Sequence, residues 1–159
     1  MDKQKLIDAI CVQLERDLEA LSAAAMASRE AAVGEESKPE NEYDTRGLEA
    51  SYLAGAQAKR AQEIAEQIAF YKSLNPKKFS ARDAIAALAL VKVERAGKQS
   101  YVFLVPKGGG ISLSVQGKPV QAIAVGAPLG EALIGLRTGD EAAIETPRGS
   151  HVYEILGLS

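Results

Sequence analysis

Residues 35–44 are the part of this sequence best suited to chemistry with a metal ion. They read Glu-Glu-Ser-Lys-Pro-Glu-Asn-Glu-Tyr-Asp, so five carboxylates and one lysine stand within ten residues. Mg²⁺ prefers oxygen ligands and is commonly held by one or two protein carboxylates together with water and partner groups. Paired metals stabilise the attacking and leaving oxygens of phosphodiester chemistry. The segment therefore favours delivery of carboxylates to the Mg²⁺ of another enzyme, with no metal stably bound by this chain alone.

The same segment also has the composition of a helix start. Ser37 and Glu40 have the spacing of a capping box, Pro39 fits the first turn, and acidic residues are favourable at the positive end of the helix dipole. Solvated charge at a helix start therefore remains an alternative interpretation of these carboxylates.

The remaining chain offers little for a catalytic centre of its own. Cys11 is the single cysteine and His151 the single histidine, which excludes disulfides and His-based metal sites or triads within one chain. Gly108-Gly109-Gly110 is not followed by Lys-Ser/Thr, so it indicates a turn and not a phosphate loop. We expect an accessory factor with no tightly bound cofactor, not an enzyme.

The composition limits the class of partner and the compartment. A formal net charge of −2 argues against independent binding of nucleic acid through phosphate contacts. The sequence has no apolar run near the ~20 residues of a membrane helix and no secretory pattern at its start. A cytoplasmic protein is expected.

Residues 1–75 carry apolar residues at alternating spacings of three and four, which predict two long helices with one seam each. The first seam is Ile7, Cys11, Leu14, Leu18, Leu21, Ala25 and Ser28, and the second is Tyr43, Gly47, Ala50, Ala54, Gln57, Ala61, Ile64, Ile68 and Tyr71. The connection around residues 33–38 is too short for a parallel return, so we expect an antiparallel coiled-coil arm with the acidic segment at its tip. Heptads alone also fit a dimerisation coiled coil, but a self-paired arm needs no second chain, and a monomer is expected.

Residues 76–159 have a different pattern, and Asn75-Pro76 marks the change because proline disfavours helix in the residue before it. Short Val- and Ile-rich runs between turn residues predict strands at 88–94, 101–105, 111–115, 120–125, 141–145 and 152–156, with a short helix at about 129–134. The whole sequence therefore predicts an α+β protein: a helical hairpin at 1–75 and a small β-rich domain at 76–159.

Two segments also carry motifs, Pro39-Glu40-Asn41-Glu42-Tyr43 and a tail that begins Ala127-Pro128-Leu129-Gly130. The tail continues through Glu131-Ala132-Leu133-Ile134-Gly135, Gly139-Asp140 and Thr146-Pro147-Arg148-Gly149 to Tyr153-Glu154-Ile155. The first segment resembles the tip of the Gre transcript-cleavage factors, where Asp-x-x-Glu-Asn opens the second arm helix and Glu-Tyr follows. The tail is similar to the C-terminal signature of that family, Ser-Pro-(Leu/Ile)-x-x-Ala-Leu-(Leu/Ile)-Gly, then Gly-Asp, Pro-x-Gly and Tyr-x-(Ile/Val).

The resemblance implies a bacterial transcription elongation factor that binds RNA polymerase and meets nucleic acid only within the transcription complex. It implies an FKBP-like β domain that docks beside the secondary channel of the polymerase. The docking loop would be Gly126, Ala127, Pro128 and Leu129. The arm would enter the channel, where Glu36 and Glu40 would reach Mg²⁺ shared with the polymerase and promote cleavage of backtracked RNA. The other tip residues would be Glu35, Ser37, Asn41, Glu42, Tyr43 and Asp44.

Several positions depart from the family pattern and keep other hypotheses open. Ser37 stands where the tip aspartate falls, and serine can cap a helix but cannot give Mg²⁺ a charged ligand; Glu36 could substitute. Gly126 and Ala127 replace an acidic residue and a serine, and Glu131 replaces an arginine. A second hypothesis is therefore a secondary-channel regulator that does not cleave. A third, a prolyl isomerase or chaperone-like binder, rests on FKBP-like topology alone.

Overall fold

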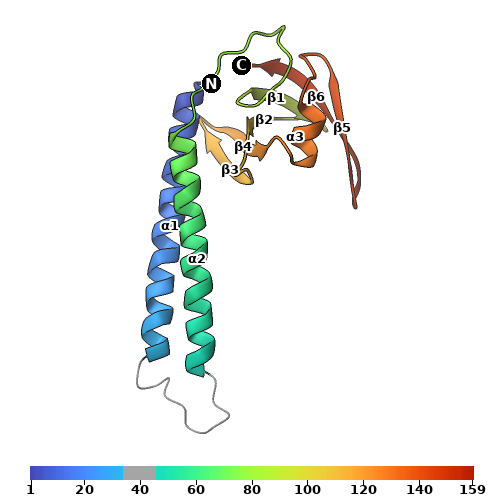
Figure 1. Ribbon diagram of the computed structural model, residues 1–159. Coiled ribbons are helices and arrows are strands. Elements are labelled where there is room, and N and C mark those ends of the chain that lie inside the picture. Colours follow the sequence, from blue (N-terminus) through green and yellow to red (C-terminus); the bar gives the residue numbers. More distant parts are fainter. Residues whose placement is uncertain (34–45) are drawn as a thin grey trace. The chain divides into compact units, whose positions relative to one another are not determined.

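The structure, a computed structural model, describes residues 1–33 and 46–159 (Figure 1). Its elements are α1 (Lys3–Val33), α2 (Arg46–Lys72), β1 (Leu90–Arg95), β2 (Lys98–Val105), β3 (Ile111–Val115), β4 (Lys118–Ala124), α3 (Pro128–Leu133), β5 (Glu141–Thr146) and β6 (Gly149–Leu158). Two long helices followed by a six-stranded domain confirm the α+β prediction. The chain divides into an arm unit, Ile7–Leu74, and a β unit that joins Met1–Leu6 to Asn75–Ser159.

The two helices of the arm unit run antiparallel and lie side by side (Figure 1). Near one end Ser28 Oγ donates a hydrogen bond to Gln57 Oε1 at 3.0 Å. Nearer the other end Lys72 Nζ pairs with Glu15 Oε1 at 2.8 Å. Residue numbers rise along α2 as those of their partners fall along α1, which confirms the predicted direction.

The seam predicted from the heptads is the buried side of both helices. Its buried members are Ile7, Cys11, Leu14, Ile64, Ile68 and Tyr71. Ile10, which the heptads did not include, is buried as well. Leu18, Leu21 and Ser28 are only half-buried, so packing is densest near the start of α1 and the end of α2. The predicted seam positions Tyr43, Gly47, Ala50 and Ala54 have side chains outside the described part.

Cys11 and Tyr71 lie close together in this dense part of the seam, and both are buried. Burial raises the pKa of Tyr71 to about 12, with a further contribution from Cys11. Burial is also the main cause that raises the pKa of the Cys11 thiol. Both groups are therefore neutral near pH 7, which agrees with packing as the role of Cys11.

The β unit contains one sheet with the strand order β3-β4-β2-β1-β6-β5. All neighbouring strands are antiparallel except β2 and β4, which pair in parallel. Two hairpins have two-residue turns in which both residues have positive φ, Ala96-Gly97 at 51° and 72° and Gln116-Gly117 at 53° and 72°. Such turns match the twist of the strands and let pairing continue to the last residue, so β2 and β4 begin two to three residues earlier than predicted.

Strand β1 begins later than predicted because of the backbone at Leu88. This residue has φ of 69°, a left-handed conformation that interrupts an extended strand. Its N–H donates to the carbonyl oxygen of Leu104 at 2.7 Å, which fixes the turn against β2. Regular pairing therefore starts at Leu90, opposite Phe103.

One face of the sheet and helix α3 enclose the core of the β unit. The buried members of this core are Ile85, Ala89, Val91, Val93, Val102, Leu104, Ile123, Leu129, Leu133, Ala142 and Ile155. Helix α3 supplies Leu129 and Leu133, four residues apart and therefore on one side of the helix. Alternate residues of β1 and β2, including Leu90 and Phe103, are buried on the opposite face.

The first turn of α1 is part of the β unit. The ammonium group of Lys3 lies 4.7 Å from the ring centre of Phe79 and donates hydrogen bonds to the carbonyl oxygens of Lys77 and Leu88, the latter at 3.2 Å. Burial lowers the pKa of Lys3. Lys3 thus ties the start of the chain to the segment that leads into β1.

Helix α3 approaches the end of β4 so closely that one position admits only glycine. A Cβ on Gly130 would lie 2.2 Å from the carbonyl oxygen of Ala124, whereas a Cβ on Gly126 would meet nothing within 4 Å. We expect Gly130→Ala to lower the free energy of unfolding by about 1–3 kcal/mol, the usual cost of overpacking. Gly126→Ala is the matched control and should leave it within about 0.5 kcal/mol. Urea denaturation followed by circular dichroism measures both, and equal stabilities would contradict the close approach.

Candidate docking site on the β unit

The predicted tip lies outside the residues that the structure describes. This applies to Glu35, Glu36, Ser37, Glu40, Asn41, Glu42, Tyr43 and Asp44. Their proposed metal chemistry therefore stays a prediction. Within residues 1–33 and 46–159, no group of three or more His, Cys, Asp or Glu side chains could hold a metal ion. In the same ranges, no helix has the length and apolar character to cross a membrane.

The predicted docking loop connects β4 to α3, and its backbone forms the start of that helix. Ala127 occupies the N-cap position in an extended conformation, and its carbonyl oxygen accepts the Glu131 N–H at 2.8 Å. Gly126 and Pro128 are exposed and Ala127 is half-buried. Leu129 is only 8% exposed and belongs to the core. Gly126 and Pro128 are therefore accessible to a partner, whereas Leu129 packs into the core and holds the helix against it.

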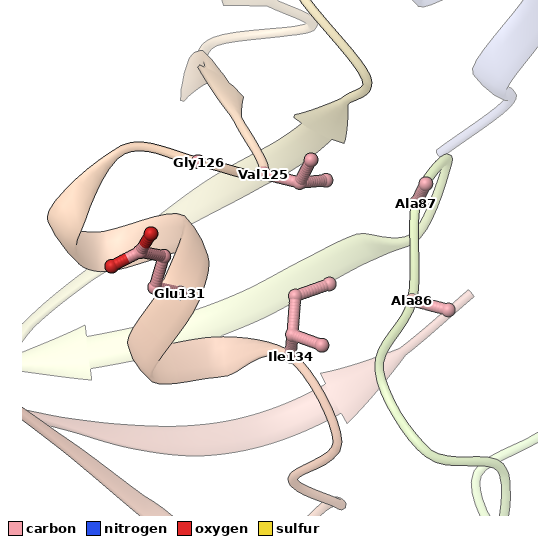
Figure 2. Close-up of a pocket in the computed structure, with 6 residues that line it drawn as sticks. All are labelled: Ala86, Ala87, Val125, Gly126, Glu131 and Ile134. Carbon is pink, nitrogen blue, oxygen red and sulfur yellow. The ribbon is translucent and has the colours of Figure 1, made fainter.

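An apolar pocket of about 510 Å³ opens beside this loop (Figure 2). Its lining residues are Ala86, Ala87, Val125, Gly126, Glu131 and Ile134. Figure 2 shows Val125 and Ile134 on one side of the space and the Ala86-Ala87 segment on the other. Clefts of this size and apolar character are typical of binding sites. Among the described residues, none of those that line the pocket is aromatic.

The pocket is hollow because three of its six lining residues, Ala86, Ala87 and Gly126, carry at most a methyl group. Backbone hydrogen bonds hold its walls in place. Ile85 N–H donates to Leu136 O, and Gly135 N–H donates to Ile85 O, each at 2.8 Å, which ties the Ala86 segment to the end of α3. These bonds do not depend on a ligand, so the pocket is preformed.

Among the described residues that line the pocket, Glu131 alone is charged. It lies in the first turn of α3, is exposed, and takes part in no side-chain hydrogen bond or ion pair within the described part of the chain. Ile134, one turn further along, is 42% exposed, which is unusual for a large aliphatic side chain beside a buried Leu133. Together they place an unpaired carboxylate and an exposed apolar side chain on one surface.

Sequence reasoning found Gly126 but did not assign Ala86, Ala87, Val125 or Ile134 to a site. The sequence held only a weak signal for these residues. Ile134 does not continue the four-residue spacing of the buried Leu129 and Leu133, and Ala86 and Ala87 are notable only for their small side chains. Glu131 was noted only as a departure from the family pattern.

Comparison with known proteins adds sequence evidence for the same part of the chain. Residues 83–159 match the family model described as transcription elongation factor, GreA/GreB, C-term. A curated relative, the transcription elongation factor GreA of Desulfovibrio desulfuricans, is 30% identical over 102 residues, which cover 63% of this chain. The chain spans only 59% of the length of that relative.

Two solved structures were also matched, both at low sequence identity and low TM-score. The GreA factor homolog 1 (Gfh1) protein of Thermus thermophilus is 20% identical, with 94% of each chain covered and a TM-score of 0.38. The transcription elongation factor GreA/GreB from Nitrosomonas europaea is 21% identical, with 62% of this chain and 78% of that chain covered and a TM-score of 0.38. The family model spans all six strands and α3, so the β unit from residue 83 to residue 159 is similar to the C-terminal part of GreA/GreB factors.

Proposed function

We propose that this protein binds RNA polymerase through its β unit and regulates transcription elongation. The observation that carries the proposal is the preformed apolar pocket beside the Gly126–Leu129 loop, within the domain that matches the GreA/GreB model. A preformed surface with exposed apolar groups is suited to contact another protein.

In this proposal the arm enters the secondary channel of the polymerase. Its helices have 31 and 27 residues, and at about 1.5 Å per residue they extend for roughly 40–46 Å. Helices of this length are long enough to reach a recessed active centre. Glu36 and Glu40 would there assist the polymerase Mg²⁺ in hydrolysing backtracked RNA.

Binding is tested with purified core RNA polymerase from the same bacterium. The chain should elute with the polymerase in size-exclusion chromatography, and it should compete with a peptide or factor known to occupy the secondary channel. Absence of a complex at micromolar concentrations of both proteins would refute the proposed function.

A second candidate, a channel occupant that regulates without cleaving, is favoured by the single observation of Ser37 at the position of the tip aspartate. It predicts a stable polymerase complex in which stalled RNA is not shortened. Rapid cleavage by the wild-type protein would exclude it.

A further inference from the structure

The pocket carries information about the chemistry of its occupant, and this inference rests on the proposed function. Five of its six lining residues are Ala, Val, Ile or Gly, so the space favours an apolar side chain. Its walls are fixed by backbone hydrogen bonds on both sides of Ala86 and Ala87. An apolar group entering it therefore loses water without requiring the pocket to rearrange.

The charge at the pocket restricts the occupant further. Glu131 has no partner among the described residues, so its carboxylate remains available for an intermolecular bond. When an apolar surface covers the pocket, water is excluded beside this carboxylate, and an unpaired negative charge there becomes unfavourable. A lysine or arginine of the partner would remove that penalty with a charge-assisted hydrogen bond. An acidic partner surface would be repelled.

We propose that the pocket binds an apolar side chain of RNA polymerase that is flanked by a lysine or arginine, with the basic group paired to Glu131. The pocket is better suited to a side chain on a protein surface than to an enclosed small ligand, because residues that line it are themselves exposed. Gly126, which lines the pocket, is exposed, and Ile134 is 42% exposed. The contact thus has an apolar centre with one charge beside it, the usual composition of a specific interface.

The test compares dissociation constants for core polymerase among four forms of the full chain. Glu131→Arg should weaken binding at least tenfold, roughly the effect of a central interface residue. Ala86→Leu, which fills the pocket from an exposed position, should have a similar effect. Glu145→Arg is the matched control because Glu145 is exposed on β5, does not line the pocket, and undergoes the same change in charge.

The outcomes separate this inference from the proposed function. If the wild type binds polymerase and both pocket variants bind equally well, the pocket is not the contact and the inference is overturned while the proposed function stands. If Ala86→Leu weakens binding but Glu131→Arg does not, the basic flank is overturned. If the wild type does not bind, the proposed function fails, and the assigned occupant fails with it. Thermal melting identifies an unfolded variant, and Glu131→Gln, with a smaller loss expected, then replaces it in the comparison.

Discussion

Replacing Glu36 and Glu40 together by glutamine should lower the rate of RNA cleavage in stalled transcription complexes by at least about a hundredfold. Glutamine keeps the length of each side chain and its carbonyl oxygen but removes the negative charge that attracts Mg²⁺. Loss of one preorganised electrostatic contact to a reacting centre commonly costs two to three orders of magnitude. The measurement is the rate at which labelled backtracked RNA is shortened at saturating factor.

A matched control removes two carboxylates from the side of the arm. Glu19 and Glu30 are exposed on α1, and their double replacement by glutamine should leave cleavage within about twofold of the wild type. Polymerase affinity should be similar in all three proteins, because the tip variants alter the proposed chemistry and not the β unit. Cleavage at the wild-type rate by the Glu36/Glu40 variant would contradict the tip mechanism.

If the wild-type protein binds polymerase without cleaving RNA, a substitution at the tip should instead produce a gain of function. Ser37→Asp would restore a carboxylate at the family's tip position, and RNA shortening should then appear. A Ser37→Ala variant separates this effect from helix capping, because it removes the hydroxyl without adding charge.

Leu133→Ala should produce a large loss of stability in the β unit, about 2–5 kcal/mol in the free energy of unfolding. Leu133 is completely buried in the core, and it is one of two leucines that hold α3 against the sheet. Helix α3 has six residues, too few to be stable without packing. Guanidinium denaturation monitored by circular dichroism measures the loss.

Ile134→Ala provides the control at the next position. Ile134 is 42% exposed, so truncating it to alanine should lower the free energy of unfolding by less than about 1 kcal/mol. For polymerase binding the order should be reversed. Ile134→Ala should cause the larger loss, since Ile134 lines the pocket and Leu133 does not. Equal destabilisation of both would show that α3 is not packed as described.

Local patterns in the sequence were sufficient for much of this fold. The heptads identified six buried seam residues of the arm, and Ser28 faces Gln57 as antiparallel pairing requires. All six strands were predicted within a few residues, because Gly97 and Gly117 mark hairpin turns that need positive φ.

The arrangement of the strands could not be predicted in the same way. The parallel pairing of β2 with β4 brings Tyr101 beside Val120, and nothing in either strand specifies that neighbour. The left-handed backbone at Leu88 is likewise fixed by a contact with Leu104, a residue distant in sequence. These features depend on tertiary contacts that outweigh local propensity.

The candidate site was only partly predictable for the same reason. The resemblance identified the loop that contains Gly126, but Ala86 and Ile134 line one pocket because of tertiary contacts, among them the backbone hydrogen bonds that join Ile85 to Gly135 and Leu136. The tip assignments depend on sequence alone, since the structure does not describe those residues.

The placement of Met1–Leu6 in the β unit has a consequence for biosynthesis. Residues 1–6 are translated well before the remaining residues of their unit, which begin at Asn75. The contacts of Lys3 with Lys77, Phe79 and Leu88 close a loop of more than 70 residues, and such closure is slow relative to local helix formation. The helical hairpin can therefore form before the strands are translated, whereas the β unit reaches its final packing only after residues 75–159 have been added.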